Sequence, residues 1–467
     1  MSGHDHLPAR IARHMINTLL QRLTQLIRPE RAQQLAKEQG WYQRQGKISP
    51  FEFLYSGLGQ GSALALTLNA QAGSLSQPVS RQAIDQRYNR AAVEFFKHAF
   101  QESLAQTLNW KTDSAMTRLL GQRFAAVRLF DSTHCPCSDA LAQLFAAFGG
   151  RAGQAGVKVL LSYDYGTGQL HPLDVLPGKC SDQGLAERVA QEVGPQELGI
   201  WDKGFYKAGA LRRVAQRGAY FLMPWPQSVR VYRTDGQGER GLGLEVAAEL
   251  KASSQNWVEW PRVELGQTEE SRLGPVRLIA YRLREEQANR RRAALREKCR
   301  TYGRQPTQEA LELAGWLILL TNAPADLLPT AAVGFVYRVR WQVELIFKQW
   351  KSVLRLDVLP SRNPYRVQCE IWGRLLLGVL TFVWYQHANA ACLAGHDCEI
   401  SFAKVAKQLQ QHGQSLVRAL FGHRERLESE YRALWKKLLK LARKERQPSR
   451  PTTWENLCIH LLQAPGG

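Results

Sequence analysis

The sequence predicts an α/β protein whose mixed-sheet core is interrupted by an antiparallel β insertion and flanked by helical N- and C-terminal regions. Three observations support this fold class. Short hydrophobic runs alternate with helical periodicity between about 120 and 216. Short β-like runs joined by glycine, proline and charged residues replace that alternation over 217–283. Helical periodicity dominates from residue 1 to about 115 and again after 365.

The N-terminal part is predicted to be helical, with breaks at proline and glycine residues. Ser80 is the expected N-cap of a short polar helix that follows it. This helix would present four polar side chains, namely Arg81, Gln82, Arg87 and Arg90. Two interpretations fit the pattern equally: the second helix of a DNA-reading helix-turn-helix, and an ordinary solvated helix.

Four hydrophobic runs predict the strands of the core. They cover residues 124–130, 157–163, 169–176 and 198–201. The first run ends at Asp131, and the last ends at Asp202. Helices are expected over 183–193 and 207–216. Strands that alternate with helices in this way indicate a mixed sheet.

The stretch 217–283 is predicted to be the antiparallel insertion, because its short apolar runs are separated by turn residues. A basic and helical run follows at 290–304. A buried strand then resumes at 316–320, and a long helix is expected over about 330–354. The remaining chain is predicted to be helical, with a second basic stretch at 436–446.

Neither a membrane span nor a signal peptide is expected. The longest apolar run, Leu375 to Tyr385, has 11 residues, whereas a helix needs about 20 to cross a bilayer. The apolar residues between 11 and 27 have the spacing of an amphipathic helix. We therefore expect a soluble protein with no membrane partner.

The charge balance predicts a polyanionic partner. The chain has 467 residues, with 62 Lys and Arg against 41 Asp and Glu, and a formal net charge of +21. Its isoelectric point is about 9.8. Such a balance is typical of proteins that bind nucleic acid, and the alternative is a basic protein with no such partner.

The cysteines indicate a reducing compartment. Eight cysteines in a chain of this length are too few for a disulfide scaffold. Cys135 and Cys137 follow His134 closely, but no second pair provides the other half of a zinc site. Reduced structural thiols in a cytosolic protein are the favoured interpretation.

Two aspartates have the same sequence context. Asp131 and Asp202 each follow a hydrophobic strand, and each precedes small or polar residues. Catalytic groups gather at strand ends in α/β proteins, and paired carboxylates are ligands for Mg²⁺. For either aspartate alone, a turn-forming or capping role is the more common one.

A third carboxylate lies on the predicted long helix. Tyr337, Arg340, Glu344 and Lys351 are spaced by 3, 4 and 7 residues. On a continuous helix with 3.6 residues per turn they fall at about 0°, −60°, −20° and −40°. One narrow face would therefore carry a phenol, two cations and a carboxylate. A solvated face with an Arg340–Glu344 ion pair is the alternative.

These residues resemble a known family. The pattern Tyr-x2-Arg-x3-Glu-x6-Lys is the signature of the insertion-sequence-4 type of DDE transposases, and this chain matches it at every position. Phe130-Asp131-Ser132-Thr133 is similar to the family's first aspartate motif. Trp201-Asp202-Lys203-Gly204-Phe205 resembles the second, with Lys203 where Arg is common. Leu319-Leu320-Thr321-Asn322 is similar to the strand that precedes the glutamate helix. The resemblance extends over most of 120–360 and implies an RNase H-like core.

The resemblance implies a mechanism. Asp131, Asp202 and Glu344 would bind two Mg²⁺ ions, with Mn²⁺ as a substitute, to activate a nucleophile and stabilise the leaving oxygen at phosphorus. The site would hydrolyse a strand at a transposon end, form and reopen a DNA hairpin, and join the 3′-OH to target DNA. No nucleotide cofactor is implied.

The resemblance also implies DNA contacts. Tyr337, Arg340 and Lys351 would hold phosphates beside the cleavage site. Trp316 and Trp341 are candidates for stacking a flipped base, although a buried core role is equally compatible with each. The N-terminal helices, with Arg81, Gln82 and Arg87, would recognise the terminal inverted repeat. The basic runs at 290–304, with Arg290, Arg291 and Arg292, and at 436–446 would bind the DNA backbone. A solvated charged face is the alternative for these runs.

We therefore expect four regions. They are a helical DNA-end-binding domain at 1–118, the RNase H-like catalytic core at 119–216 and 316–360, the β-rich insertion with its basic segment at 217–315, and a helical region for dimer contacts at 361–467. The expected partners are terminal inverted repeats, target DNA and a second copy in a synaptic complex, in the cytoplasm at the nucleoid. Three alternatives remain: a silent DNA-binding protein of the same fold, a nuclease or resolvase that cuts without joining, and a basic RNA-binding or structural protein.

Overall fold

The structure is a computed structural model of the whole chain. It describes residues 28–59, 67–108, 121–149, 153–165, 169–234, 240–356, 358–396, 400–409 and 424–441. The expected amphipathic helix near the N-terminus and residues 442–446 of the C-terminal basic stretch lie outside the described residues.

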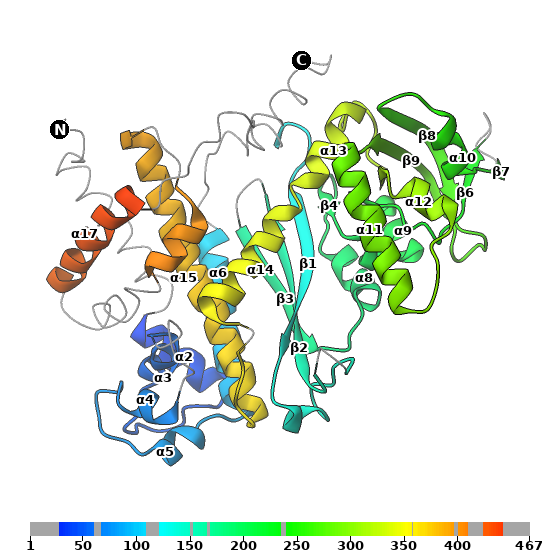
Figure 1. Ribbon diagram of the computed structural model, residues 1–467. Coiled ribbons are helices and arrows are strands. Elements are labelled where there is room, and N and C mark those ends of the chain that lie inside the picture. Colours follow the sequence, from blue (N-terminus) through cyan, green and yellow to red (C-terminus); the bar gives the residue numbers. More distant parts are fainter. Residues whose placement is uncertain are drawn as a thin grey trace.

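One ten-stranded sheet runs through the protein, in the order β3-β2-β1-β4-β5-β10-β9-β8-β6-β7 (Figure 1). Its first five strands are β1 Val127–Pro136, β2 Gly156–Asp164, β3 Gln169–Pro177, β4 Leu198–Ile200 and β5 Tyr220–Pro224. Strands β1, β2 and β3 are antiparallel neighbours, and β4 is parallel to both β1 and β5. The predicted mixed sheet is confirmed.

Strand β1 corrects the prediction that the first strand ends at Asp131. The strand continues to Pro136, and Asp131 pairs with Leu161 of β2 in its middle. The hydrophobic run ends at Phe130, but Thr133 and Cys135 remain buried on alternate positions. This two-residue period keeps the polar segment in the sheet.

The two faces of the sheet have separate hydrophobic cores. Phe130 of β1 and Leu160 of β2 pack with the helices α8 Asp182–Gln191 and α9 Ala208–Gln216 on one face. Leu129 and Val159 belong to the other core, which includes the helices α13 Thr330–Arg338 and α14 Trp341–Leu354. Side chains alternate across a strand, so Asp131 lies on the face covered by α14.

The other half of the sheet is antiparallel. It consists of β6 Val231–Thr234, β7 Arg240–Gly243, β8 Trp257–Leu265, β9 Leu273–Arg282 and β10 Trp316–Thr321. The helices of this part are α10 Val246–Ala252, α11 Glu285–Thr301 and α12 Gln308–Leu313. Strand β5 lies within the span expected for the insertion, but its parallel pairing with β4 joins it to the mixed half.

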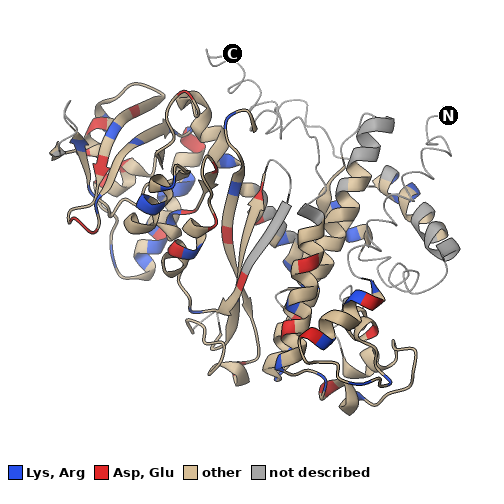
Figure 2. Cartoon of the chain, turned by 180° about the vertical axis from the view of Figure 1, so that it is seen from behind, with Lys and Arg blue, Asp and Glu red and all other residues tan. Residues whose placement is uncertain are grey.

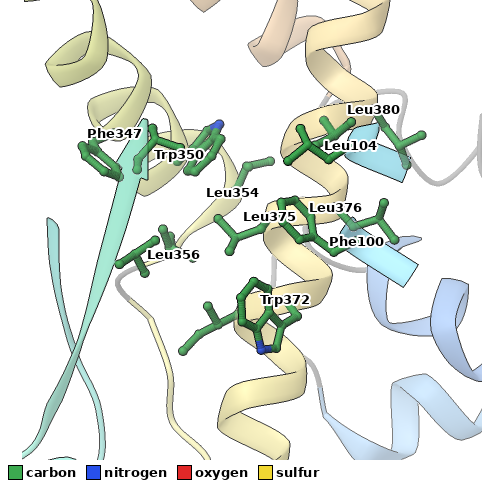
Figure 3. Packing of buried hydrophobic residues seen from close by; sticks show 14 of the residues in the cluster. Phe100, Leu104, Phe347, Trp350, Leu354, Leu356, Trp372, Leu375, Leu376 and Leu380 are labelled. Carbon is green, nitrogen blue, oxygen red and sulfur yellow. The ribbon is translucent and has the colours of Figure 1, made fainter. Parts of the chain in front are cut away.

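Helices from both ends of the chain pack together beside the sheet. The N-terminal ones are α2 Pro29–Glu38, α3 Pro50–Gly59, α4 Leu68–Ala72, α5 Arg81–Asp85 and α6 Arg90–Leu108, and the C-terminal ones are α15 Pro364–His396 and α17 Arg424–Leu441. Figure 3 shows α15 between α6 and α14, where Trp372 and Leu375 meet the apolar side chains of both neighbours. Arg374 of α15 also donates to the carbonyl of Val358, beyond the end of α14, at 2.8 Å.

The predicted long helix over 330–354 is broken in two. Helix α13 ends at Arg338, and α14 begins at Trp341. Between them, the amides of Val339 and Arg340 donate to carbonyls three residues back, at 3.1 and 3.0 Å. Three-residue bonds tighten the chain locally, while Val339 and Arg340 keep helical backbone angles. The hydrophobic pattern concealed this break because α13 and α14 both keep an apolar face.

Helix α15 contains a segment, Pro364–Asn389, that is long and apolar enough to cross a membrane. It is longer than the apolar run seen in the sequence, because isolated polar residues interrupt the run without ending the helix. In the structure 83% of its most apolar window is buried inside the protein. This burial is what the core helix of a globular protein requires.

Candidate active site

Three carboxylates converge at the edge of the parallel strands. Asp131 lies in the middle of β1, and Asp202 follows the neighbouring strand β4 after one residue, Trp201. Asp202 precedes the short 3₁₀ helix η3 Lys203–Phe205, without capping it through its side chain. Glu344 lies in the first turn of α14, which packs against β1. The parallel pairing of β1 and β4 and the crossing of α14 bring these three elements together.

Asp131 is in an environment that disfavours its charge. Burial is the main cause that raises its pKa to about 6, and the carboxylates of Glu344 and Asp202 contribute to this rise. A hydrogen bond from the Ser132 amide, at 2.9 Å, and the Arg340 guanidinium act in the opposite direction. A buried carboxylate beside two others is a typical site for a cation.

Arg340 supplies positive charge to this cluster. Its guanidinium donates to Glu344, and its Nη1 lies 3.8 Å from Asp131 Oδ2. Its Nε donates to the Tyr337 hydroxyl at 3.3 Å. Arg340 lies at the break between α13 and α14. Tyr337, Arg340 and Glu344 remain together because Val339 and Arg340 keep helical backbone angles across the break.

A cavity of about 510 Å³ opens beside the carboxylates. It is lined by Asp131, Ser132, Thr133, Glu344, Phe347, Lys348, Lys351 and Ser352. Acidic groups therefore share the lining of the cavity with two lysines of α14 and with the Ser132–Thr133 segment of β1. Such a lining suits a phosphate group that is bound together with a cation.

The donor set fits Mg²⁺ in chemistry. Carboxylate oxygens are the ligands that Mg²⁺ prefers, and the raised pKa of Asp131 shows a charge that lacks full compensation. Within the described residues, however, no three His, Cys, Asp or Glu side chains stand in a ready-made metal arrangement. The Arg340–Glu344 ion pair has to open before the three carboxylates can share a cation.

Comparison with known proteins identifies the family. The transposase DDE domain family matches residues 122–380, which include all three carboxylates. This chain belongs to the transposase DDE domain family. The match covers more than half of the chain, including α14 and all ten strands of the sheet. The convergence of two aspartates and a glutamate is therefore found in a chain of the DDE kind, whose members are polynucleotidyl transferases or endonucleases.

Bacterial relatives are similar over most of their length. The transposase for insertion sequence element IS231B of Bacillus thuringiensis subsp. berliner is 27% identical over 446 residues, covering 91% of this chain and 92% of the relative. The transposase for insertion sequence element IS1151 of Clostridium perfringens is 24% identical, covering 83% of this chain and 84% of the relative. A solved structure, the piggyBac transposase synaptic complex with hairpin DNA, aligns with a TM-score of 0.43 at 11% identity, over 90% of this chain and 83% of that one.

The two candidate tryptophans of this DDE family member differ in exposure. Trp316 is 2% exposed, and the guanidinium of Arg282 lies 4.4 Å from its ring centroid. It therefore offers no ring face to a DNA base, which corrects its assignment as a stacking platform. Trp341 is 56% exposed at the start of α14, three residues before Glu344. The sequence could not separate them because both lie in strongly apolar segments.

The expected DNA-binding residues near the N-terminus lie on a surface. Ser80 caps α5 as predicted, through a 3.2 Å bond from the Ala83 amide to its hydroxyl. Arg81 and Gln82 are exposed on α5. Arg87 lies beyond the end of α5, with its guanidinium 5.5 Å from the Trp41 ring centroid.

The arginines of α11 have three different environments. Arg290 is exposed and pairs with Glu286. Arg291 is exposed as a residue, but its guanidinium donates to the Trp316 carbonyl at 2.6 Å, and burial of that group lowers its pKa. Arg292 pairs with Glu285 at 2.9 Å. Figure 2 shows Lys and Arg on the helices beside the antiparallel strands, interspersed with Asp and Glu. Arg291 is thus tethered to β10 by one hydrogen bond while the residue remains exposed, and its contact with DNA stays a prediction.

The sequence analysis missed two residues that line the cavity. Lys348 and Ser352 lie on α14 with Lys351. Lys348 follows Glu344 by four residues, so helical spacing places both on one face. That spacing was a usable signal, because the long helix had already been predicted around Glu344.

Proposed function

We propose that this chain is an insertion-sequence transposase of the insertion-sequence-4 type, which moves its element by cutting and pasting DNA. One observation carries the proposal. Asp131 and Glu344 share a cavity with Lys348 and Lys351, and Asp202 follows the strand next to Asp131. Acidic groups that hold a cation and basic groups that hold phosphate are what phosphoryl transfer on DNA requires.

The proposal includes an RNase H-like core. Its support is the strand order β3-β2-β1-β4-β5, with an antiparallel first half and parallel pairing of β1, β4 and β5. The proposal also includes four regions: an end-binding region at 1–118, the core at 119–216 and 316–360, the insertion at 217–315, and a dimer region at 361–467. Pairing of β5 with β4 supports extending the first core segment to Pro224.

Asp131, Asp202 and Glu344 would hold two Mg²⁺ ions, or Mn²⁺ in their place. When bound, the ions lower the pKa of a water or a 3′-OH and neutralise the charge that develops on the leaving oxygen. The protein contributes the positions of the carboxylates. The protein also buries Asp131 between β1 and α14. Because burial excludes solvent, the carboxylate would interact more strongly with a bound cation there.

Residues around the carboxylates would position the DNA. Lys351 and Lys348 would contact phosphates in the cavity, and Arg340 would exchange its contact with Glu344 for a phosphate. Tyr337 would orient Arg340 through its hydroxyl. Trp341 would stack a displaced base beside the site, because its ring is exposed next to Glu344.

Hairpin formation and strand transfer complete the proposed reaction. Two transposon ends have to be cut and joined together, so a synaptic complex of two copies is expected. The helical regions at both ends would carry end recognition and dimer contacts. A net charge of +21 supports binding to DNA at the nucleoid of a bacterial cytoplasm.

The test is a cleavage assay with purified full-length protein. Its substrate is DNA carrying the flanks of the chain's own gene, with Mg²⁺ or with EDTA, analysed on denaturing gels. Glu344→Gln is the loss-of-function variant. Glu269→Gln, on the exposed turn between β8 and β9, is the matched control. We expect metal-dependent nicks at an inverted repeat, then a hairpin-sized product, both absent in Glu344→Gln and retained in the control.

Each alternative has its own outcome. Cutting without a hairpin or strand transfer would indicate a nuclease or resolvase. DNA-end binding without cutting, under conditions where both ends can pair, would indicate a silent DNA-binding protein. Equal cutting by Glu344→Gln and the wild type would contradict the assigned active site.

A further inference from the structure

Asp182 joins three elements behind the carboxylate cluster. It is the first residue of α8, which Ser181 caps. Its Oδ1 accepts hydrogen bonds from Ser132 Oγ at 2.6 Å and from Lys158 Nζ at 2.9 Å. Ser132 belongs to β1, and Lys158 belongs to β2. One carboxylate oxygen thus ties the start of α8 to both strands.

Ser132 connects Asp182 to Asp131. Its side chain contacts Asp182, and its backbone amide donates to Asp131 Oδ1 at 2.9 Å. Neighbouring side chains point to opposite faces of a strand, so the Asp182 contact holds β1 from behind the catalytic face. Fixing the backbone of Ser132 therefore fixes a hydrogen-bond donor to Asp131.

Asp182 also packs against the segment that follows Asp202. A Cβ placed on Gly204 would lie 3.1 Å from Asp182 Oδ2 and 3.3 Å from its Cβ. Gly204 belongs to η3, which begins directly after Asp202. The absence of a side chain at Gly204 allows this close approach. Asp182 is consequently in contact with both segments that carry the paired aspartates.

The Lys158–Asp182 ion pair is poorly explained as a source of stability alone. The Lys158 side chain is 10% exposed and the Asp182 side chain 34%. Moving a lysine out of water costs free energy that a single ion pair often fails to recover, and apolar replacements of such pairs are frequently neutral. The location of the pair, between the carriers of Asp131 and Asp202, suggests a role in geometry.

We propose that Asp182 is a positioning residue that sets the separation of the Asp131 and Asp202 carboxylates for metal binding. It acts through the Ser132 hydroxyl on one side and through packing against Gly204 on the other. This inference rests on the proposed function, because it requires that Asp131 and Asp202 share a cation. Partners that orient metal ligands commonly contribute about 10–100-fold in metal affinity.

The test compares two double variants of the full-length, DNA-free protein. Both contain Lys158→Met, so neither leaves a buried lysine unpaired. Asp182→Ala removes the acceptor for Ser132, whereas Asp182→Asn retains an oxygen in the same place. The Mn²⁺ dissociation constant is measured from the electron paramagnetic resonance signal of free Mn²⁺. Thermal unfolding confirms that each variant is folded at the temperature of the titration.

We expect Lys158→Met with Asp182→Ala to weaken Mn²⁺ binding by about tenfold or more. Lys158→Met with Asp182→Asn should remain within about threefold of the wild type, because the Ser132 hydrogen bond is retained. Ser132→Ala alone should weaken Mn²⁺ binding by a factor that lies between those of the two double variants. Glu264→Gln, which alters a buried carboxylate paired with Arg272 in the insertion, should leave Mn²⁺ affinity unchanged.

Asp131→Asn separates the two possible failures. If it binds Mn²⁺ as the wild type does, the metal site itself is misassigned, and the proposed function fails together with this inference. If Asp131→Asn loses binding but the Asp182→Ala double variant retains wild-type affinity, Asp182 has no positioning role. Equal weakening in both double variants would also contradict the role of the Ser132 contact.

Discussion

The guanidinium of Arg340 lies between the carboxylates of Glu344 and Asp131. It donates to Glu344, and its Nη1 is 3.8 Å from Asp131 Oδ2. Both partners are proposed metal ligands, so in this structure an internal cation compensates part of the charge that Mg²⁺ would compensate. Arg340 lies directly before α14, one helical turn from Glu344, and can therefore reach both carboxylates.

Removing Arg340 should strengthen metal binding and weaken DNA binding. In DNA-free Arg340→Ala, Mn²⁺ no longer competes with a half-buried ion pair of about 1 kcal/mol, so affinity should rise roughly fivefold. Binding to transposon-end DNA should weaken, because a phosphate ligand is lost. Titration with Mn²⁺ and a gel-shift assay measure the two effects.

Arg338→Ala is the matched control for Arg340. Arg338 is exposed two residues earlier and stacks on Phe335, with its guanidinium carbon 5.2 Å from the ring centroid. The Mn²⁺ affinity of this variant should equal that of the wild type. Weaker Mn²⁺ binding in Arg340→Ala would mean that Arg340 orients the carboxylates instead of competing with the metal.

Lys351 and Lys348 should each contribute one phosphate contact. Both line the cavity beside Asp131 and Glu344. Substituting either with alanine should reduce the slope of log affinity against log salt concentration by about one. Mn²⁺ affinity in the absence of DNA should change little. Fluorescence anisotropy with labelled end DNA at several salt concentrations measures the slope.

Lys251→Ala provides the comparison for the two lysines, because Lys251 is exposed on α10 in the antiparallel half. Its salt slope should match that of the wild type. If Lys351→Ala also leaves the slope unchanged, the cavity does not hold the DNA backbone.

The sequence predicted the location of the site better than its internal geometry. Asp131, Asp202 and Glu344 were proposed from their sequence context and spacing, and the structure brings them close together although Asp131 lies inside β1. Ser80 was correctly assigned as an N-cap. The continuation of β1 past Asp131 was missed because polar residues hide a strand when only alternate positions are buried. The contacts of Asp182 were beyond prediction, because they join elements whose relative positions only the folded sheet determines.

Substitution of Trp316 should lower the stability of the protein, whereas substitution of Trp341 should weaken DNA binding. Trp316 is 2% exposed in the core, so Trp316→Ala should lower the free energy of unfolding by about 3–5 kcal/mol. Trp341 is 56% exposed, so Trp341→Ala should change it by less than about 0.5 kcal/mol. Trp341→Ala should instead weaken binding to DNA with a displaced base by about 1–3 kcal/mol. Urea unfolding and binding titrations measure these changes.

Trp257, which is 48% exposed on β8, is the control for Trp341. Trp257→Ala should leave binding to the same DNA unchanged. An equal loss of binding in both variants would indicate a general effect of surface tryptophans, and no loss in Trp341→Ala would remove it as the stacking platform.

His134 should make the protein less stable in acid. Burial, together with the charges of Lys351 and Lys158, lowers its pKa below the usual value near 6.5. Its Nε2 is buried without a hydrogen-bond partner among the described residues, and a Cβ on Gly178 would lie 2.7 Å from it. The unfolded chain therefore binds this proton more readily than the folded protein does. Neutral His134 therefore contributes its full share of stability above about pH 6.5, the pKa of histidine in the unfolded chain. This stability is lost as the pH falls from there towards the lower pKa of the folded protein.

His134→Phe keeps a ring in the same space and removes the titration. As the pH is lowered from 7.5 to 5.5, the melting temperature of the wild type should fall further than that of His134→Phe. Scanning calorimetry at fixed ionic strength measures both. His98→Gln is the control, because His98 lies on α6 outside the sheet. Its melting temperature should fall with pH as far as that of the wild type. Parallel curves for the wild type and His134→Phe would mean that the ring accepts its proton in place, without any cost to the fold.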